Sequence, residues 1–457
     1  MVTTNREEVR RDNTSRQKRV AVITFGCKVN QYESACILNK FQHKGYLPVS
    51  FREEADIYII NTCTVTNRTD YKSRNAIRQA LARKNNSPET RVIVTGCYAQ
   101  LNREHILAMG NIDLVVDNNH KGDIMSFLEE GESNFIANSE EFDTFNEQQT
   151  ETLFNRSRAF IKIQDGCDYF CAYCAIPLAR GKPRSRRPEN VLAQIDKLFA
   201  VGYREFVLTG INLGLYGRDF CNDTQERDVG ENIDNLASLL FRIENVEGVE
   251  LIRLSSLEPQ LIDERILGFI RKSSKLASHL HIPLQSGSDQ ILQAMNRPYT
   301  TGQFRELIEQ IIILRPDTAL GSDVILGLPG ETEDLFRETL SLIEQLPLTY
   351  LHIFPYSRRP GTRAAVMPGI PTTAATSKRA AVMTELMKDK RKAYTEMLIS
   401  KKVELKGILE TKRGNYWTAL SDHYIRMYYK SNNCAKGDVI SGIAFRKLYD
   451  GIEVVDR

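Results

Sequence analysis

Three cysteines set close together, Cys167, Cys171 and Cys174, constrain this chain more than any other feature of its sequence. Thiolates at this spacing can bind three irons of a cubane iron–sulfur cluster, which leaves the fourth iron open to a small molecule. A structural zinc site instead needs a fourth cysteine or histidine at short range, and none follows Cys174 before Cys221. The spacing of these three residues, the close-set cysteines, therefore favours a reactive iron–sulfur cluster over zinc.

A second set, the strand-end cysteines Cys27, Cys63 and Cys97, shares one place in a repeated pattern, because each follows a short β-branched apolar run. Such runs are typical of buried parallel strands, and the amphipathic stretches 31–45 and 70–84 are typical of crossover helices. Neighbouring strands of a doubly wound parallel sheet end at one edge, so we expect these thiols to meet there as metal ligands. The remaining cysteines are interpreted as small core hydrophobes: Cys36, Cys221 and Cys434.

Length and composition bound the remaining possibilities. A chain of 457 residues is too long for one core and predicts about three domains. Its 61 basic and 58 acidic residues create no global field that would identify a partner. Nine cysteines assigned mostly to metal indicate a reducing compartment, and we expect a cytoplasmic protein. No stretch approaches the ~18 apolar residues of a membrane span, and residues 1–17 are predicted to be a disordered tail, not a signal peptide.

Hydrophobic patterning divides the chain after this tail. An α/β pattern covers residues 18–137, and the acidic, aperiodic stretch 138–155 is typical of a linker. Residues 156–396 then alternate helix-like segments with six strand-like runs: 159–164, 205–209, 249–254, 280–283, 320–326 and 349–354. Six βα units do not close the eight-stranded barrel, so we predict an open, partial (βα)6 barrel with its site at the carboxyl ends of the strands. Polar and glycine-rich residues follow these strands and together outline a pocket.

Three longer strings carry a resemblance to a known family: 281–289, 323–333 and 354–362. With the spacing of the close-set cysteines, they resemble the methylthiotransferase family of radical S-adenosylmethionine (SAM) enzymes over nearly the whole chain. The resemblance implies a three-cysteine amino-terminal domain, a radical SAM barrel, and a small all-β, TRAM-like RNA-binding barrel over residues 397–457.

The resemblance also implies the chemistry of two [4Fe–4S] clusters. The cluster on the close-set cysteines would bind SAM and generate a 5′-deoxyadenosyl radical, and the cluster on the strand-end cysteines would carry sulfur that a second SAM methylates. Radical chemistry suits an adenine C2–H, which lies beyond the reach of general bases. Asp165 and Arg180 flank the cysteine loop, where they either orient ligands or form a solvent-facing ion pair. The residues that the resemblance suggests for SAM binding are Gly210, Ser255, Ser256 and Gln285.

Two local strings, 26–34 and 61–67, resemble the branch that acts on N6-threonylcarbamoyladenosine in tRNA, next to the anticodon. The isopentenyladenosine branch more often has Gln-Met-Asn after the first cysteine, and the branch acting on a ribosomal-protein aspartate has Pro-Lys-Asn. Lys28 and Val29 match neither string, yet both substrates stay open as alternatives, as does a non-catalytic RNA-binding protein with structural metal. We expect a flavodoxin or ferredoxin as electron donor, and a monomer.

The carboxyl-terminal residues give independent evidence for RNA binding. Residues 401–457 hold eleven basic and seven acidic side chains, interleaved with aromatic ones: Tyr416, Trp417, Tyr424, Tyr428, Tyr429 and Tyr449. Cations bind phosphates and aromatic rings stack on unpaired bases, so this mixture favours a structured RNA. The alternative is that the aromatic residues form the core of a small β-barrel. The basic stretch 388–392 either extends the phosphate contacts or forms a solvated helix face.

Overall fold

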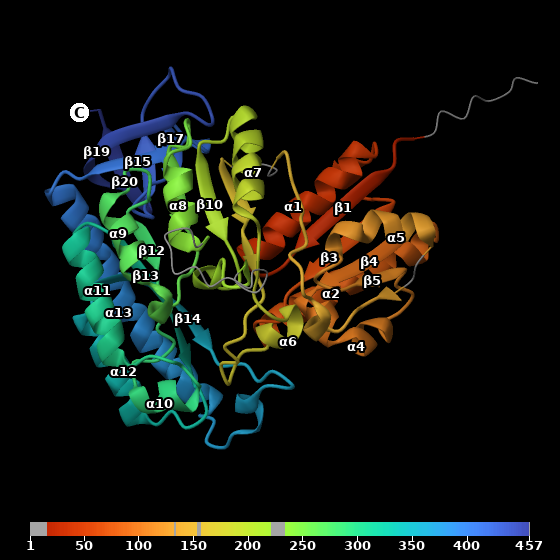
Figure 1. The fold of residues 1–457 in the computed structure, drawn as a ribbon, viewed down its shortest axis with the longest axis horizontal. Helices are drawn as coiled ribbons and strands as arrows, with labels where there is room; N and C mark the ends of the chain where they lie inside the picture. Colours follow the sequence, from red (N-terminus) through yellow and green to blue (C-terminus); the bar gives the residue numbers. More distant parts are fainter. Residues whose placement is uncertain (1–15, 132–133, 153–156, 221–233, 457) are drawn as a thin grey trace, which may run out of the picture.

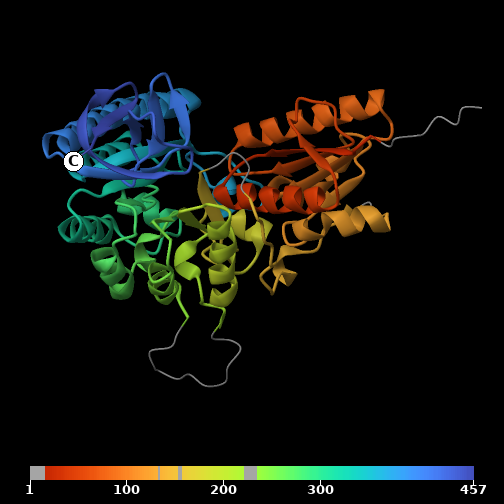
Figure 2. The ribbon, with the colours of Figure 1, turned by 90° about the horizontal axis from the view of Figure 1, so that it is seen from above.

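The computed structural model describes residues 16–131, 134–152, 157–220 and 234–456, which form three parts (Figure 1). The amino-terminal sheet lies to one side of the barrel, and the carboxyl-terminal strands lie against the barrel itself (Figure 2). Most of the predicted tail, residues 1–15, and Cys221 lie outside the described residues. Within the described ranges, no helix combines the length and the apolarity needed to cross a bilayer.

The amino-terminal part is a parallel sheet with the strand order β2-β1-β3-β4-β5-β6. Its strands are β1 (Arg19–Thr24), β2 (Leu47–Val49), β3 (Ile57–Thr62), β4 (Arg91–Gly96), β5 (Leu114–Val116) and β6 (Asn134–Phe135). Its helices are α1 (Lys28–His43), α2 (Asn67–Asn86), α3 (Cys97–Leu101), α4 (Arg103–Leu107) and α5 (Ile124–Glu130). Alternate residues of β3 serve opposite faces: Ile59 packs with α1 and α5, while Ile60 packs with α2. The predicted doubly wound sheet is confirmed.

The central part is a parallel partial barrel in which chain order and spatial order agree. Its strands are β7 (Arg158–Lys162), β10 (Glu205–Thr209), β11 (Leu251–Leu254), β12 (His279–His281), β13 (Ala319–Leu326) and β14 (Leu348–Pro355). These strands form two three-stranded sheets, β7-β10-β11 and β12-β13-β14. A parallel bridge between Ile252 of β11 and Leu276, which precedes β12, joins the two sheets. The intervening helices are α7 (Pro188–Ala200), α8 (Leu236–Glu244), α9 (Glu264–Lys272), α10 (Asp289–Ala294), α11 (Thr301–Leu314) and α12 (Glu333–Gln345). The predicted (βα)6 architecture is confirmed.

The carboxyl-terminal part is a curled, mostly antiparallel sheet with the order β15-β19-β20-β18-β17-β16. Its strands are β15 (Glu404–Ile408), β16 (Thr411–Arg413), β17 (Tyr416–Leu420), β18 (Arg426–Tyr429), β19 (Val439–Leu448) and β20 (Gly451–Val455). A bridge from Gly407 to Ser421 brings β15 back toward β17. The long helix α13 (Thr373–Ser400) contacts both β14 and β19. This fold is consistent with the predicted TRAM-like barrel, while the domain boundaries remain predictions.

The described residues of the acidic segment, 138–152, form a packed connection between the first two parts. Phe142 is 1% exposed. Tyr32 Oη of α1 donates to the Gln148 carbonyl over 2.6 Å, and Gln194 Nε2 of α7 donates to the Thr150 carbonyl over 2.7 Å. These contacts use backbone oxygens, which explains why a polar and aperiodic sequence gives no sign of them.

Candidate active site

The strand-end cysteines lie at one edge of the amino-terminal sheet. Cys27 immediately precedes α1, Cys63 follows β3, and Cys97 begins α3 directly after β4. Gly26, with φ +94°, makes this convergence possible, because a Cβ at this position would lie 2.5 Å from Cys63 Sγ. All three cysteines line one cavity.

The close-set cysteines lie in the loop between β8 (Gln164–Asp165) and the short helix α6 (Ile176–Arg180). Arg297 Nη1 donates to Cys171 Sγ over 3.1 Å, and Asn212 Nδ2 lies 4.0 Å from Cys167 Sγ. Donors around a sulfur stabilise its thiolate form, and a cationic donor does so most strongly.

Burial acts against ionisation of these thiols. Burial first, and then the charges of neighbouring thiols, raise the pKa of Cys63 and of Cys174 to about 12. Without a metal the two thiols are therefore protonated at neutral pH, and metal binding has to release protons from them.

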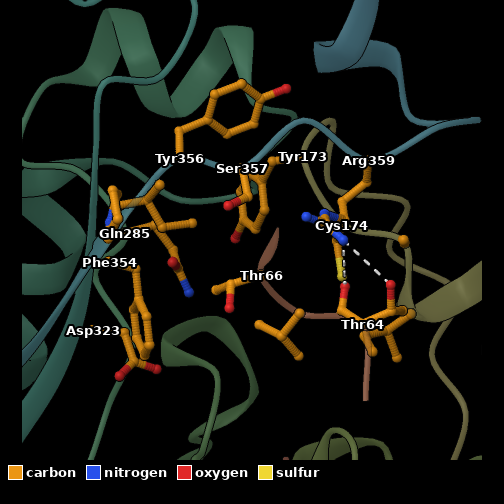
Figure 3. Close-up of a pocket in the computed structure, with 15 residues that line it drawn as sticks. Thr64, Thr66, Tyr173, Cys174, Gln285, Asp323, Phe354, Tyr356, Ser357 and Arg359 are labelled. Atoms are coloured by element: carbon orange, nitrogen blue, oxygen red, sulfur yellow. Dashed lines mark hydrogen bonds between the residues drawn. The ribbon is translucent and has the colours of Figure 1, made fainter. Parts of the chain in front are cut away.

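A large cavity of about 1000 Å³ extends from the strand-end cysteines into the barrel, and a smaller one of about 240 Å³ lies beside Cys174. Figure 3 shows the smaller cavity, with Cys174 and Thr64 on one side and Gln285 on the other. The two cavities share seven lining residues: Val65, Thr66, Ile176, Asp323, Phe354, Pro355 and Ser357. The strand-end cysteines and Cys174 therefore line neighbouring cavities with a shared wall.

The residues expected to bind SAM divide between the two cavities. Gly210, Ser255 and Ser256 line the large cavity, and Gln285 lines the small one. Ser255 Oγ is buried and has no hydrogen-bond partner among the described residues. Gln285 adopts a left-handed backbone with φ 67°, and its N–H donates to the Asp323 carbonyl over 2.8 Å. An unpaired buried hydroxyl at the cavity wall is a ready donor or acceptor for a ligand.

Arg180 connects the two halves of the site. It is fully buried, and its Nη1 donates to Asp165 Oδ1 over 2.9 Å and to Glu33 Oε1 of α1 over 3.0 Å. Its Nε lies 3.4 Å from Cys97 Sγ. Our alternative of a solvent-facing pair between Asp165 and Arg180 is therefore wrong, because their partners come from distant segments that cover them.

The charges around Arg180 do not cancel. Lys121 Nζ lies 2.5 Å from Glu33 Oε2, and Lys162 Nζ lies 2.8 Å from Glu33 Oε1 and 2.6 Å from Asp165 Oδ2. With Arg180, and with Arg184 at 3.8 Å from Asp165 Oδ2, this group holds four cations and two carboxylates, so positive charge is in excess beside Cys97. Such an environment favours an anionic ligand set at Cys97.

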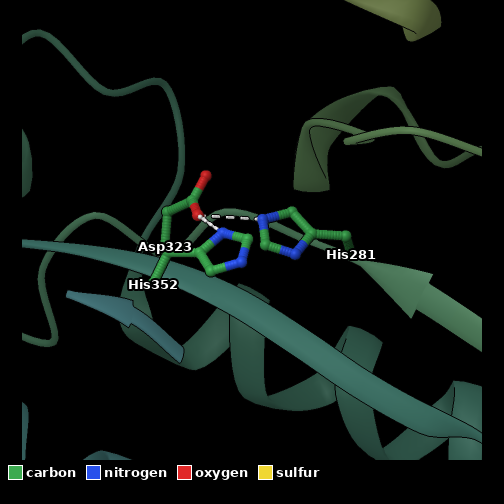
Figure 4. A group of neighbouring side chains, drawn as sticks. All are labelled: His281, Asp323 and His352. Atoms are coloured by element: carbon green, nitrogen blue, oxygen red, sulfur yellow. Dashed lines mark hydrogen bonds and ion pairs between the residues drawn. The ribbon is translucent and has the colours of Figure 1, made fainter. Parts of the chain in front are cut away.

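A row of hydrogen-bonded rings crosses the cavity wall. His281 Nε2 and His352 Nδ1 each lie 3.0 Å from Asp323 Oδ1 (Figure 4). Tyr350 Oη lies 3.0 Å from His281 Nδ1 and 2.7 Å from His279 Nε2. Burial alone would raise the pKa of Asp323, but hydrogen bonds from both histidines outweigh it and hold this pKa below its ordinary value. The ionised carboxylate only accepts, so the nitrogen of each ring that faces it carries a proton.

The carboxyl-terminal part contributes Tyr424 to the same cavity. This ring stacks on His279 at 4.1 Å and on Tyr350 at 5.1 Å. Lys28, the first residue of α1, lines the cavity beside Cys27. Residues from all three parts of the molecule therefore build the wall.

The basic and aromatic residues of the carboxyl-terminal part separate into two groups. Tyr428 is fully buried in the sheet, as the alternative of an aromatic core predicts. Lys412 Nζ lies over the half-buried Trp417 at 4.8 Å, and Arg413 lies over the exposed Tyr449 at 4.2 Å. Exposed rings paired with cations are suitable for stacking bases beside phosphates.

Comparison with known proteins identifies the family of this chain. Residues 19–117 match the model of the uncharacterized protein family UPF0004, and residues 161–343 match the radical SAM superfamily. A protein of Aquifex aeolicus named threonylcarbamoyladenosine tRNA methylthiotransferase MtaB is 40% identical, and the match covers 83% of this chain and 90% of the relative. The MtaB protein of Bacillus subtilis is 37% identical, with 92% of each chain covered. The chain belongs to the MtaB family of methylthiotransferases.

The fold of this family member also resembles a solved radical SAM structure. The tryptophan-bound structure of the radical S-adenosylmethionine methyltransferase TsrM from Kitasatospora setae superposes with a TM-score of 0.58. It covers 77% of this chain and 75% of TsrM, at 13% sequence identity. At this identity the likeness concerns the fold alone.

Several residues of the cavity wall were missed by the sequence analysis. His281 and Asp323 begin two of the strings that carried the family resemblance, and His352 lies two residues before the third. His281 ends β12, whereas Asp323 and His352 lie inside β13 and β14, so a search for titratable residues within the barrel strands would have found them. Tyr424 carries no such signal, because its place in the cavity depends on how the carboxyl-terminal part packs against the barrel.

Proposed function

We propose that this chain is a radical SAM methylthiotransferase that converts N6-threonylcarbamoyladenosine in tRNA, next to the anticodon, to its 2-methylthio derivative. The observation that carries the proposal is a pair of neighbouring cavities that share seven lining residues, one lined by all three strand-end cysteines and the other by Cys174. The names of the Aquifex and Bacillus relatives supply the nucleoside and the reaction.

The donor sets fit two [4Fe–4S] clusters. A single tetrahedral zinc ion would hold its sulfurs about 3.8 Å apart, given Zn–S bonds of about 2.3 Å. In neither set do all three sulfurs lie within 4.8 Å of one another, so each set suits a larger inorganic core. Arg180 beside Cys97 and Arg297 beside Cys171 supply the positive charge that such an anionic core requires. The close-set and the strand-end cysteines would hold one cluster each.

The remaining residues prepare the space for the substrates. When bound, the clusters supply the electron that cleaves SAM to a 5′-deoxyadenosyl radical and the iron at which the transferred sulfur is held. Ser255 Oγ, Ser256 and the backbone at Gly210 would bind SAM, together with Gln285 from the adjoining cavity. Tyr424, stacked on His279, would close the cavity on the side of the carboxyl-terminal part. The cationic and aromatic surface of that part would hold the tRNA.

Two measurements test the proposal. Anaerobically purified protein should contain about eight irons per chain, and a protein that contains only zinc would reject it. Nucleosides from a strain that lacks the gene should retain threonylcarbamoyladenosine and lose its 2-methylthio derivative. Unchanged tRNA nucleosides in that strain would reject the proposed substrate.

A further inference from the structure

Lys28 is a cation that lines the large cavity and forms no direct ion pair with a described residue. It follows Cys27, begins α1 and lines the large cavity in a half-buried position. Among the described residues, no hydrogen bond or ion pair forms at its ammonium group. A partly desolvated charge without a counterion is unfavourable, so this group favours an anion that enters the cavity.

The other charged groups near the cavity already have partners. Arg180 pairs with Glu33 and Asp165, and Arg253, behind Tyr424, pairs with Glu205 over 2.8 Å. Asp323 is the carboxylate that lines the cavity; its charge acts on Lys28 from a distance, but its hydrogen bonds are made with both histidines, and it forms no ion pair with Lys28 among the described residues.

Arg68 also lines the cavity, but it lies exposed in the first turn of α2. Water therefore solvates its guanidinium group whether or not a ligand is bound. Lys28 is the cavity cation for which an incoming anion makes the larger difference.

The nucleoside of the proposed function carries one anionic group on its base, the carboxylate of its threonyl substituent. We propose that Lys28 binds this carboxylate and so selects threonylcarbamoyladenosine over adenosines whose N6 substituent is neutral. This inference rests on the proposed function, and it adds a residue that determines specificity. Lys28 is next to Cys27, so the threonyl group would be held beside the strand-end cysteines while the base lies between the two sets.

The test compares two anticodon stem-loop RNAs bound to the reconstituted holoenzyme. One carries threonylcarbamoyladenosine, and the other carries the same nucleoside with a carboxamide in place of the carboxylate. The wild-type protein should bind the carboxylate form about 10- to 100-fold more tightly, the range expected for a charged hydrogen bond. Lys28→Met should reduce this ratio to near one, and Lys28→Arg should restore most of it.

Controls separate this role from a structural one. Lys44→Met, at the other end of α1 in an exposed pair with Glu129, should keep the wild-type iron content and binding ratio. If Lys28→Met loses iron, Lys28→Gln provides the same comparison with a polar side chain. A Lys28 variant that keeps its iron and the wild-type ratio would overturn the inference. Failure of the proposed function is seen separately, as the absence of methylthio product from the wild-type enzyme.

Discussion

Arg180 is the residue whose side chain links the surroundings of the two sets of cysteines. Its guanidinium group holds Asp165 next to the close-set cysteines and Glu33 of the amino-terminal sheet, and it contacts Cys97. Along the sequence, Arg180 is separated from Asp165 by 15 residues, from Cys97 by 83 and from Glu33 by 147. The spacing of the cysteines is local and could be predicted from the sequence, whereas this contact depends on tertiary packing and could not.

Replacing Arg180 with methionine should strongly destabilise the protein. The substitution removes the guanidinium donor of two buried carboxylates, Glu33 and Asp165, and breaking a buried pair in this way costs about 3–5 kcal/mol. Urea denaturation followed by circular dichroism measures the change in apparent unfolding free energy. Lys44→Met, which removes an exposed pair with Glu129, should cost no more than about 1 kcal/mol. Equal effects of the two substitutions would contradict the buried network.

The same network predicts how stability depends on pH. Burial alone would raise the pKa of Glu33, but Arg180, Lys121 and Lys162 outweigh it and hold this pKa well below its ordinary value of 4.5. A depressed folded pKa gives stability that is complete above pH 4.5 and is lost as the pH falls further. Glu33→Gln should therefore be less stable than the wild type at pH 7 and should lose less stability between pH 5 and pH 3. Denaturation midpoints across this range test the prediction, and parallel curves would refute it.

Gly26 allows a prediction about one set of cysteines alone. A Cβ at this position would lie 2.5 Å from Cys63 Sγ, and φ is +94°. Gly26→Ala should therefore displace Cys27 from Cys63 and reduce iron from about eight to about four per chain. Gly45→Ala is the matched control, because Gly45 has φ +83° and open space around it. This variant meets the backbone strain without the clash and should keep its iron, as quantification of iron and sulfide would reveal.

At the scale of elements, the sequence predicts where the strands lie better than it predicts the contacts of the segments that connect the parts. The strand-like runs identified all six barrel strands, and the helix-like segments expected between them include α7 (Pro188–Ala200). The packing of residues 138–152 was not predicted, because polar side chains and backbone oxygens make its contacts. Hydrophobic periodicity carries no information on such contacts.

The turn between β17 and β18 carries one further prediction. Tyr424 in this turn stacks on His279 and Tyr350 of the barrel, and such aromatic pairs contribute about 0.5–1.5 kcal/mol each beyond burial. Tyr424→Ala should lower the apparent unfolding free energy by about 1–3 kcal/mol. Phe445→Ala, an exposed position on β19, should change it by less than about 0.5 kcal/mol. Urea denaturation tests both, and a neutral Tyr424 variant would contradict this docking contact.

At the scale of the whole molecule, positive charge gathers in the carboxyl-terminal part. Lys402, Lys430 and Lys447 are exposed there, and no ion pair with a described residue occupies them. Replacing Lys430 and Lys447 with alanine should weaken tRNA binding and make it less dependent on salt. Each lost phosphate contact should reduce the slope of log affinity against log salt by about 0.7–0.9. Filter binding at several salt concentrations measures the slope, and an unchanged slope would place the phosphate contacts elsewhere.

The contacts between the amino-terminal sheet and the barrel restrict how this protein can be recombined with its relatives. Arg359, which follows β14, donates to Asp70 of α2 over 2.5 Å, and Arg180 of the barrel reaches Glu33 of α1. A chimaera that exchanges only the sheet would keep these pairs only where the new sheet carries the same charged groups. A substitution that removes a charge on one side of this boundary therefore leaves a buried charge on the other side without its partner.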